Sequence, residues 1–141
     1  MQYLKDYLDY AVFGVLGLMS FLMLAFVIER YLYLARVDLG RFQDLDELTI
    51  SLTSHLTTIA TVGANAPYVG LLGTVLGILI TFHDLGQGGG IETSAIMLGL
   101  ALALKATALG LVVAIPSIIF YNALLRRVEV LQMQWRRLQA A

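Results

Sequence analysis

The feature that most constrains this chain is a set of three long apolar stretches that carry little charge. They cover roughly residues 10–34, 63–83 and 93–125, and each reaches the ~20 residues with which a helix crosses the hydrocarbon core of a bilayer. Hydrophobic residues make up 59% of the 141 positions and charged residues only 13%, whereas soluble domains are about half apolar and one-quarter charged. We therefore predict a single all-α integral membrane domain over residues 1–141 with three transmembrane helices.

Polar segments follow the first and third stretches. Between residues 35 and 62, leucine and isoleucine recur every three or four positions among Asp, Glu, Thr and Ser, which predicts an amphipathic helix outside the membrane. That helix is expected to continue into the second span as one long helix loosened near Pro67, because proline lacks the amide hydrogen of a helical bond. Residues 126–141 repeat the amphipathic pattern and predict a second helical extension.

Basic residues are unevenly distributed between the ends of the predicted spans. Three arginines flank the first loop and four occupy the C-terminal tail, whereas the glycine-rich turn at residues 84–92 has none. Loops rich in Lys and Arg stay on the cytoplasmic side of a membrane. The sequence therefore predicts that segments 35–62 and 126–141 are cytoplasmic, with the N-terminus and the glycine-rich turn on the opposite face.

Glycine and alanine form stripes at steps of three and four in the second and third spans. Small residues let helix backbones approach closely where no hydrophobic effect drives helices together. Packing within one chain accounts for such stripes, and two of them in so small a chain also suggest contacts between copies. The residues are Gly70, Gly73, Gly77, Gly99, Ala103, Ala106, Gly110 and Ala114.

Three polar side chains stand out within the apolar stretches. Lys105 is 12 residues into the third helix, about 18 Å along it, and is expected near mid-bilayer, where a charged group usually faces a cavity or partner. The hydroxyls of Thr74 and Thr107 could instead bond to the carbonyl four residues earlier and be structurally silent. Pro116 removes a helical hydrogen bond and is expected to bend the third helix, as Pro67 loosens the second.

Several function classes lack their usual sequence signals. The chain has no cysteine, no cluster of residues at metal-ligand spacing, and no grouping of a nucleophile with a base. A net charge of −1 without a basic run argues against nucleic-acid binding. We therefore expect no enzyme activity, cofactor, metal or nucleic-acid partner. No Asp or Glu lies inside a span, since Glu29 is at a membrane boundary. A proton-carrying carboxylate within the membrane would therefore have to come from another chain.

Two motifs on the second and third spans resemble the paired signatures of ExbB and TolQ proteins in the ExbB/TolQ/MotA family of proton-driven motor subunits. They are APYVGLLGTVLGI at residues 66–78 and ALALKATALGLVVAIP at residues 101–116, the latter followed by Phe-Tyr-Asn at 120–122. The resemblance covers residues 67–122 closely and the first span loosely. It implies a pentameric ring around a dimer of a single-span partner, ExbD, whose membrane Asp binds protons.

The resemblance also implies what such a complex does in a Gram-negative inner membrane. Proton flow would power TonB, which opens outer-membrane receptors for iron siderophores and vitamin B12. Threonines that match Thr74 and Thr107 line the central channel near the partner's Asp. The family often carries Glu where this chain has Leu102, and we expect Lys105, three residues later, to replace that group and approach the Asp.

The sequence leaves other functions open. A TolQ-like subunit, which serves outer-membrane integrity, has much the same motifs, although the short loop and tail favour an ExbB-like role. A MotA-like role is disfavoured because those proteins have four spans and a large cytoplasmic region. A small self-contained transporter, in which Lys105 binds an anionic substrate, and a purely structural membrane adaptor are further alternatives.

Overall fold

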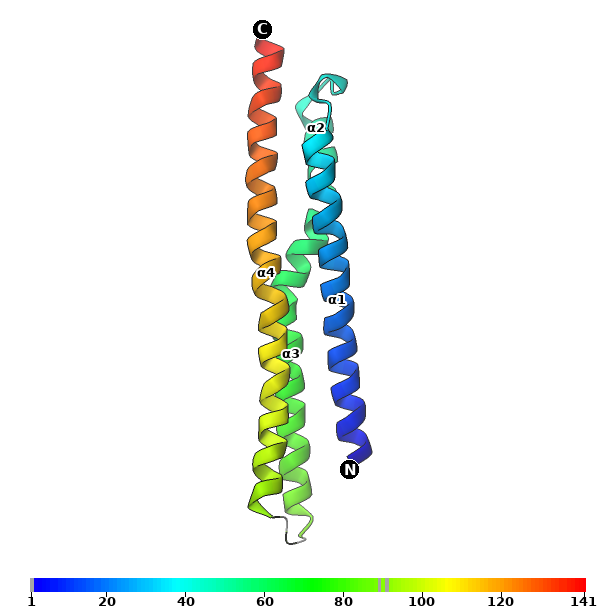
Figure 1. Cartoon of the computed structure of the whole chain (residues 1–141), viewed down its shortest axis with the longest axis vertical. Coiled ribbons are helices and arrows are strands. Elements are labelled where there is room, and N and C mark those ends of the chain that lie inside the picture. The colour runs from blue at the N-terminus through cyan, green and yellow to red at the C-terminus, as the bar shows by residue number, and fades with distance from the viewer. Residues whose placement is uncertain (1, 89, 91) are drawn as a thin grey trace.

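Three long helices make up most of the computed structural model, which describes residues 2–88, 90 and 92–141. They are α1 (Gln2–Arg36), α3 (Leu56–Gly86) and α4 (Thr93–Ala140); a 3₁₀ turn, η1 (Leu39–Arg41), and a short helix, α2 (Leu45–Leu52), connect α1 to α3. Figure 1 shows an elongated bundle with the N-terminus and the α3–α4 turn at one end, here called the N-terminal end, and α2 and the C-terminus at the other, the C-terminal end.

The long helices confirm the predicted all-helical architecture. Each of the three is long and apolar enough to cross a membrane. At 1.5 Å per residue, the 35 residues of α1 reach about 52 Å and the 48 residues of α4 about 72 Å, against a hydrocarbon core of ~30 Å. Both helices therefore extend well beyond the core. Helix α4 runs through Pro116 without interruption and includes the predicted extension at residues 126–140.

The expectation that the amphipathic helix continues into the second span as one helix is wrong. Helix α3 continues through Pro67, and the interruption lies earlier, at residues 53–55, which separate α2 from α3. His55 has a φ of 67°, a left-handed conformation that does not continue a right-handed helix. Its ring stacks on Phe26 of α1 with the ring centroids 4.4 Å apart. A contact between distant segments thus accompanies a turn that the local sequence does not indicate.

A buried cation from α1 reaches the same turn. Arg30 is 4% exposed and donates hydrogen bonds to the carbonyl oxygens of Ser51 (2.9 Å) and Leu52 (3.4 Å), the last two residues of α2. These bonds satisfy carbonyls that a helix C-terminus leaves without partners. Glu29 pairs with the guanidinium group, which lies 4.4 Å from the ring centroid of Tyr33. Arg30 therefore anchors α2 to α1 with its charge balanced.

A hydrophobic core joins α2 and the distal half of α4. Trp135 donates its indole N–H to the carbonyl oxygen of Phe42 at 3.1 Å, and Gln132 donates to the hydroxyl of Thr49 at 2.7 Å. Leu138, three residues after Trp135, is 58% exposed, so the buried stripe of α4 ends at Trp135. The buried members of this core are Met23, Val27, Leu34, Leu48, Leu52, Leu56, Ile59, Val62, Leu124, Val128, Leu131 and Trp135.

The backbones of α3 and α4 approach each other closely where their small residues meet. A Cβ atom on Gly70 would lie 2.5 Å from the carbonyl oxygen of Ala106, and one on Gly110 would lie 2.6 Å from that of Ala66. No side chain larger than hydrogen fits at either position unless the helices separate. The other small residues of the two stripes are also buried: Gly73, Gly77, Gly99, Ala103, Ala106 and Ala114.

Replacing Gly70 with alanine is expected to destabilise the protein by about 1–3 kcal/mol, since the added methyl group collides with backbone. Gly14→Ala in α1 is the matched control, because a Cβ atom there would have nothing within 4 Å and alanine favours the helix more than glycine does. Thermal unfolding of the purified protein in detergent, followed by circular dichroism, compares the two. An unchanged Tm for Gly70→Ala would contradict the close contact.

Candidate functional site

Two threonine hydroxyls meet at the contact between α3 and α4. Thr74 on α3 is 6% exposed and Thr107 on α4 is half-buried. The two hydroxyls hydrogen-bond to each other, and the Thr74 hydroxyl donates to the Ala103 carbonyl oxygen of α4 at 2.7 Å. The Gly70 carbonyl oxygen lies 3.3 Å from the Thr74 hydroxyl and 3.5 Å from that of Thr107. The hydroxyl pair therefore bridges the helices and is not satisfied within either helix alone.

Each hydroxyl carries a single proton, which limits the bonds that can exist at once. The shortest carbonyl contact, to Ala103, takes the proton of Thr74. Thr107 then donates to the Thr74 oxygen, and within the described residues its own oxygen retains lone pairs that no donor fills. Thr107 is half-buried, so part of its side chain stays exposed at the surface of the chain. The sequence did not reveal the Ala103 carbonyl as a partner, since a backbone acceptor leaves no side-chain signal.

Lys105 lies on a different side of α4 from Thr107. Residues two positions apart on an α-helix point about 200° apart. Lys105 precedes Leu109 and Val112 at steps of four and three, and those two residues line a shallow groove with Phe13 of α1. Lys105 itself is exposed and does not line the groove, so it lies at the outer edge of the side of α4 that faces α1. The sequence grouped it with the threonines, and the structure separates them.

Lys105 also lies nearer the N-terminal end than its position along α4 suggested. A Cβ atom on Gly73 would be 3.0 Å from both the Val12 side chain and the Ala106 methyl group, so residue 106 is level with residue 12 of α1. Lys105 is then level with Ala11, at the start of the uncharged stretch of α1. Figure 1 shows the reason: the α3–α4 hairpin extends beyond the start of α1. Measured against α1, Lys105 thus lies near the start of the uncharged stretch, while its expected mid-bilayer position stays a prediction.

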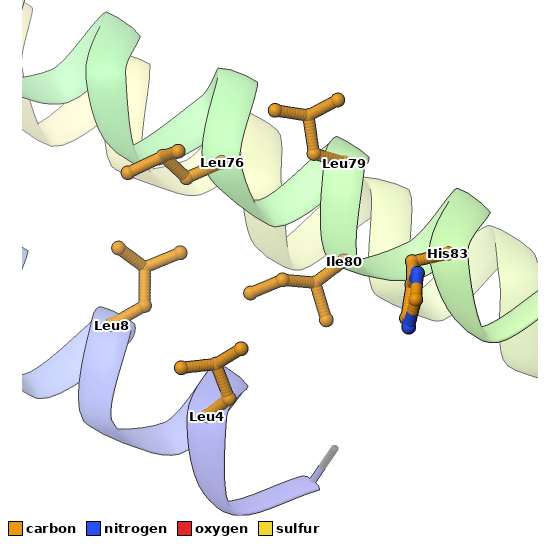
Figure 2. A pocket seen from close by; sticks show the side chains of 6 residues that line it. All are labelled: Leu4, Leu8, Leu76, Leu79, Ile80 and His83. Carbon is orange, nitrogen blue, oxygen red and sulfur yellow. The ribbon is translucent and has the colours of Figure 1, made fainter.

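An apolar groove lies between α1 and α3 near the N-terminal end (Figure 2). His83 stands at its edge, is exposed, and has Gln87 within 3.3 Å. Over residues 2–88, 90 and 92–141, no three His, Cys, Asp or Glu side chains gather as a metal site. The groove thus offers apolar surface with one titratable group at its rim. It is lined by Leu4, Leu8, Leu76, Leu79, Ile80 and His83.

Comparison with known proteins matches residues 38–137 to the MotA/TolQ/ExbB proton channel family. The biopolymer transport protein ExbB of Helicobacter pylori strain J99 is 56% identical over 136 residues, which cover 96% of this chain and 94% of that protein. The ExbB protein of Aquifex aeolicus is 53% identical over 96% of this chain and 91% of its own length. A putative ExbB-like 2 protein of Helicobacter pylori strain 26695 is 48% identical over 94% of this chain and 88% of its own length.

The matched region contains both sequence motifs and the bridging pair Thr74 and Thr107. The relatives match this chain over nearly its whole length, from the first span to the tail. Together with three helices that are apolar enough to cross a membrane, these similarities establish that the chain belongs to the MotA/TolQ/ExbB proton channel family, as a short, ExbB-like member.

Proposed function

We propose that this chain is the membrane subunit of a proton-motive-force-driven motor, in which it surrounds an ExbD-like single-span partner and energises TonB. The observation that carries the proposal is the Thr74–Thr107 pair, where two helices of a proton channel family bring hydroxyls together in an otherwise apolar contact. The apolar stretches 63–83 and 93–125 contain no Asp or Glu. The proton-binding carboxyl group would therefore come from the partner.

The hydroxyl pair can hold such a carboxyl group in either protonation state. A protonated carboxyl group donates a hydrogen bond to the open lone pairs of Thr107. An ionised carboxylate needs a donor, which Thr107 supplies when its hydroxyl rotates away from Thr74. Because rotation breaks no covalent bond, the pair can follow the protonation of the acid without ionising itself. Exclusion of water would strengthen these hydrogen bonds.

Lys105 is the expected site residue that this proposal leaves out. To approach the partner's Asp, its ammonium group would have to reach around α4 from the flank that faces α1. We therefore assign the contact with the partner's acid to Thr74 and Thr107. A self-contained transporter that binds an anionic substrate through Lys105 would instead need no partner chain.

The surface of the three spans supports assembly into a ring, for which we propose five copies around a partner dimer. Large apolar side chains stay exposed on every long helix, including Phe21, Leu72 and Ile119. Lipid can cover part of this surface, and neighbouring copies can cover the rest. A ring would bring the Thr74–Thr107 pairs of all copies around one lumen.

Native mass spectrometry of the purified complex, with and without a co-expressed ExbD-type protein, tests this assembly. We expect five copies of the 15.5 kDa chain to take up two partner chains. A monomer or dimer that ignores the partner would contradict the motor-subunit proposal and favour a transporter or an adaptor.

The distribution of basic residues supports an inner-membrane orientation with a periplasmic N-terminus and a cytoplasmic C-terminus. Of the nine Lys and Arg residues, seven lie in the segments that form the C-terminal end, and only Lys5 and Lys105 lie toward the N-terminal end. Positive residues favour the cytoplasmic face. Helix α2 and the distal half of α4 would then be cytoplasmic, where the ring could contact soluble partners.

The transport that this motor would energise is TonB-dependent import of iron siderophores and vitamin B12 across the outer membrane. A TolQ-like role in outer-membrane integrity is the second candidate, because TolQ proteins carry the same two motifs. The near full-length match to proteins named ExbB favours the import role.

Thr74→Val and Thr107→Val test the hydroxyl pair, since each removes one hydroxyl at nearly constant volume. A hydrogen bond to a charged group contributes about 1.5–3 kcal/mol, so we expect partner-dependent iron uptake to fall by roughly tenfold or more, with recovery in the serine variants. Thr81→Val is the matched control, because the Thr81 hydroxyl donates to the Gly77 carbonyl oxygen of its own helix at 3.0 Å. Wild-type uptake in both test variants would contradict the assignment.

A further inference from the structure

A second groove lies between α1 and α4 near the C-terminal end. Its apolar lining, here called the floor, includes Tyr31, Leu34 and Ala35 of α1 and Ala123 of α4, and its charged lining, here called the rim, consists of Arg126 and Arg127. Its volume of about 400 Å³ lies within the roughly 300–1,000 Å³ of small-molecule sites. The groove therefore combines an apolar floor with two positive charges at one edge.

The two arginines are available to an anion. Arg126 approaches Glu129 at 3.7 Å, but the side chains are 75% and 55% exposed, and such surface pairs contribute little. Arg127 is exposed and forms no ion pair among the described residues. None of the described residues that line the groove is acidic. Guanidinium groups bind phosphate through paired hydrogen bonds, so the rim suits a phosphate group.

The groove lies where α4 leaves its apolar stretch. Arg126 and Arg127 directly follow Leu125, the last residue of the third predicted span. Tyr31 packs edge-on against Phe120 with the ring centroids 6.4 Å apart, and tyrosine concentrates at membrane–water interfaces. The floor thus faces the acyl chains while the rim lies at the level of lipid headgroups.

We propose that this groove binds a phospholipid with a net negative headgroup, its phosphate on Arg126 and Arg127 and an acyl chain along Tyr31, Ala35 and Ala123. Basic pockets between spans on the cytoplasmic side suit such lipids. Free phosphate would leave the apolar floor uncovered. A second copy of this chain, whose Glu129 is 55% exposed at a similar level, is the alternative occupant that the test below distinguishes.

The test measures Tm of the purified, delipidated protein in detergent with phosphatidylglycerol, phosphatidylethanolamine or inorganic phosphate added. We expect phosphatidylglycerol alone to raise Tm, by about 5 °C at saturation. The double variant Arg126→Gln/Arg127→Gln should lose this rise. Arg136→Gln/Arg137→Gln is the matched control, because it removes the same charge from the same helix farther from the apolar stretch, and it should keep the rise.

A third variant separates a lipid site from general attraction to charge. Ala123→Phe fills the floor of the groove with both arginines in place, and it should also lose the rise and the bound lipid seen by native mass spectrometry. An undiminished rise in Arg126→Gln/Arg127→Gln, or an equal effect of phosphatidylethanolamine or inorganic phosphate, would overturn the proposal. If Arg126→Gln/Arg127→Gln lost ring assembly while its lipid content stayed unchanged, the lipid proposal would be overturned in favour of a contact between copies.

Discussion

The approach of the α3 and α4 backbones at Gly70 and Gly110 determines much of the geometry around the candidate site. In lipid, no hydrophobic effect drives helices together, so close packing of small residues and hydrogen bonds must do so. With a Cβ atom excluded at both glycines, the two backbones come near enough for carbonyl groups of one helix to face side chains of the other. The Thr74 hydroxyl can reach Ala103 across the interface only because of this proximity.

The C-terminal end is held together by different forces. There α1, α2, the start of α3 and the distal half of α4 share a conventional hydrophobic core. Arg30 is buried in this region and bonds to the α2 carbonyls, while Phe26 packs on His55. The chain thus joins a lipid-embedded bundle, which depends on small residues, to an end that depends on apolar burial. The arginine-rimmed groove lies where these two parts meet.

Much of this arrangement could be predicted from composition and spacing. Long uncharged stretches identified the spans, and the steps of three and four among leucines identified the helices that pack outside them. The break at His55 could not be predicted, because the ring of Phe26, a residue far away in sequence, packs against it. The side of α4 that carries Lys105, and its level relative to α1, also required the structure. Helices α1 and α4 start at different levels, so the position of a residue along α4 does not by itself give its level relative to α1.

The threonine pair illustrates the same limit on a smaller scale. Sequence alone offered two interpretations for Thr74 and Thr107, bonds within one helix or a role at a channel surface. The observed bridge satisfies the Thr74 hydroxyl inside the protein and leaves an acceptor on Thr107. Which hydroxyl oxygen keeps a free lone pair depends on the distances from the hydroxyls to the carbonyl oxygens of Ala103 and Gly70. Those distances arise only when the helices pack.

Site-specific crosslinking tests most directly which flank of α4 faces the partner. The chain has no cysteine, so Thr107→Cys and Lys105→Cys each introduce a single thiol. Each variant would be co-expressed with an ExbD-type partner that carries cysteine in place of its membrane Asp, and then oxidised. We predict a disulfide-linked product for Thr107→Cys and none for Lys105→Cys. Crosslinking from position 105 but not from position 107 would contradict the proposed site.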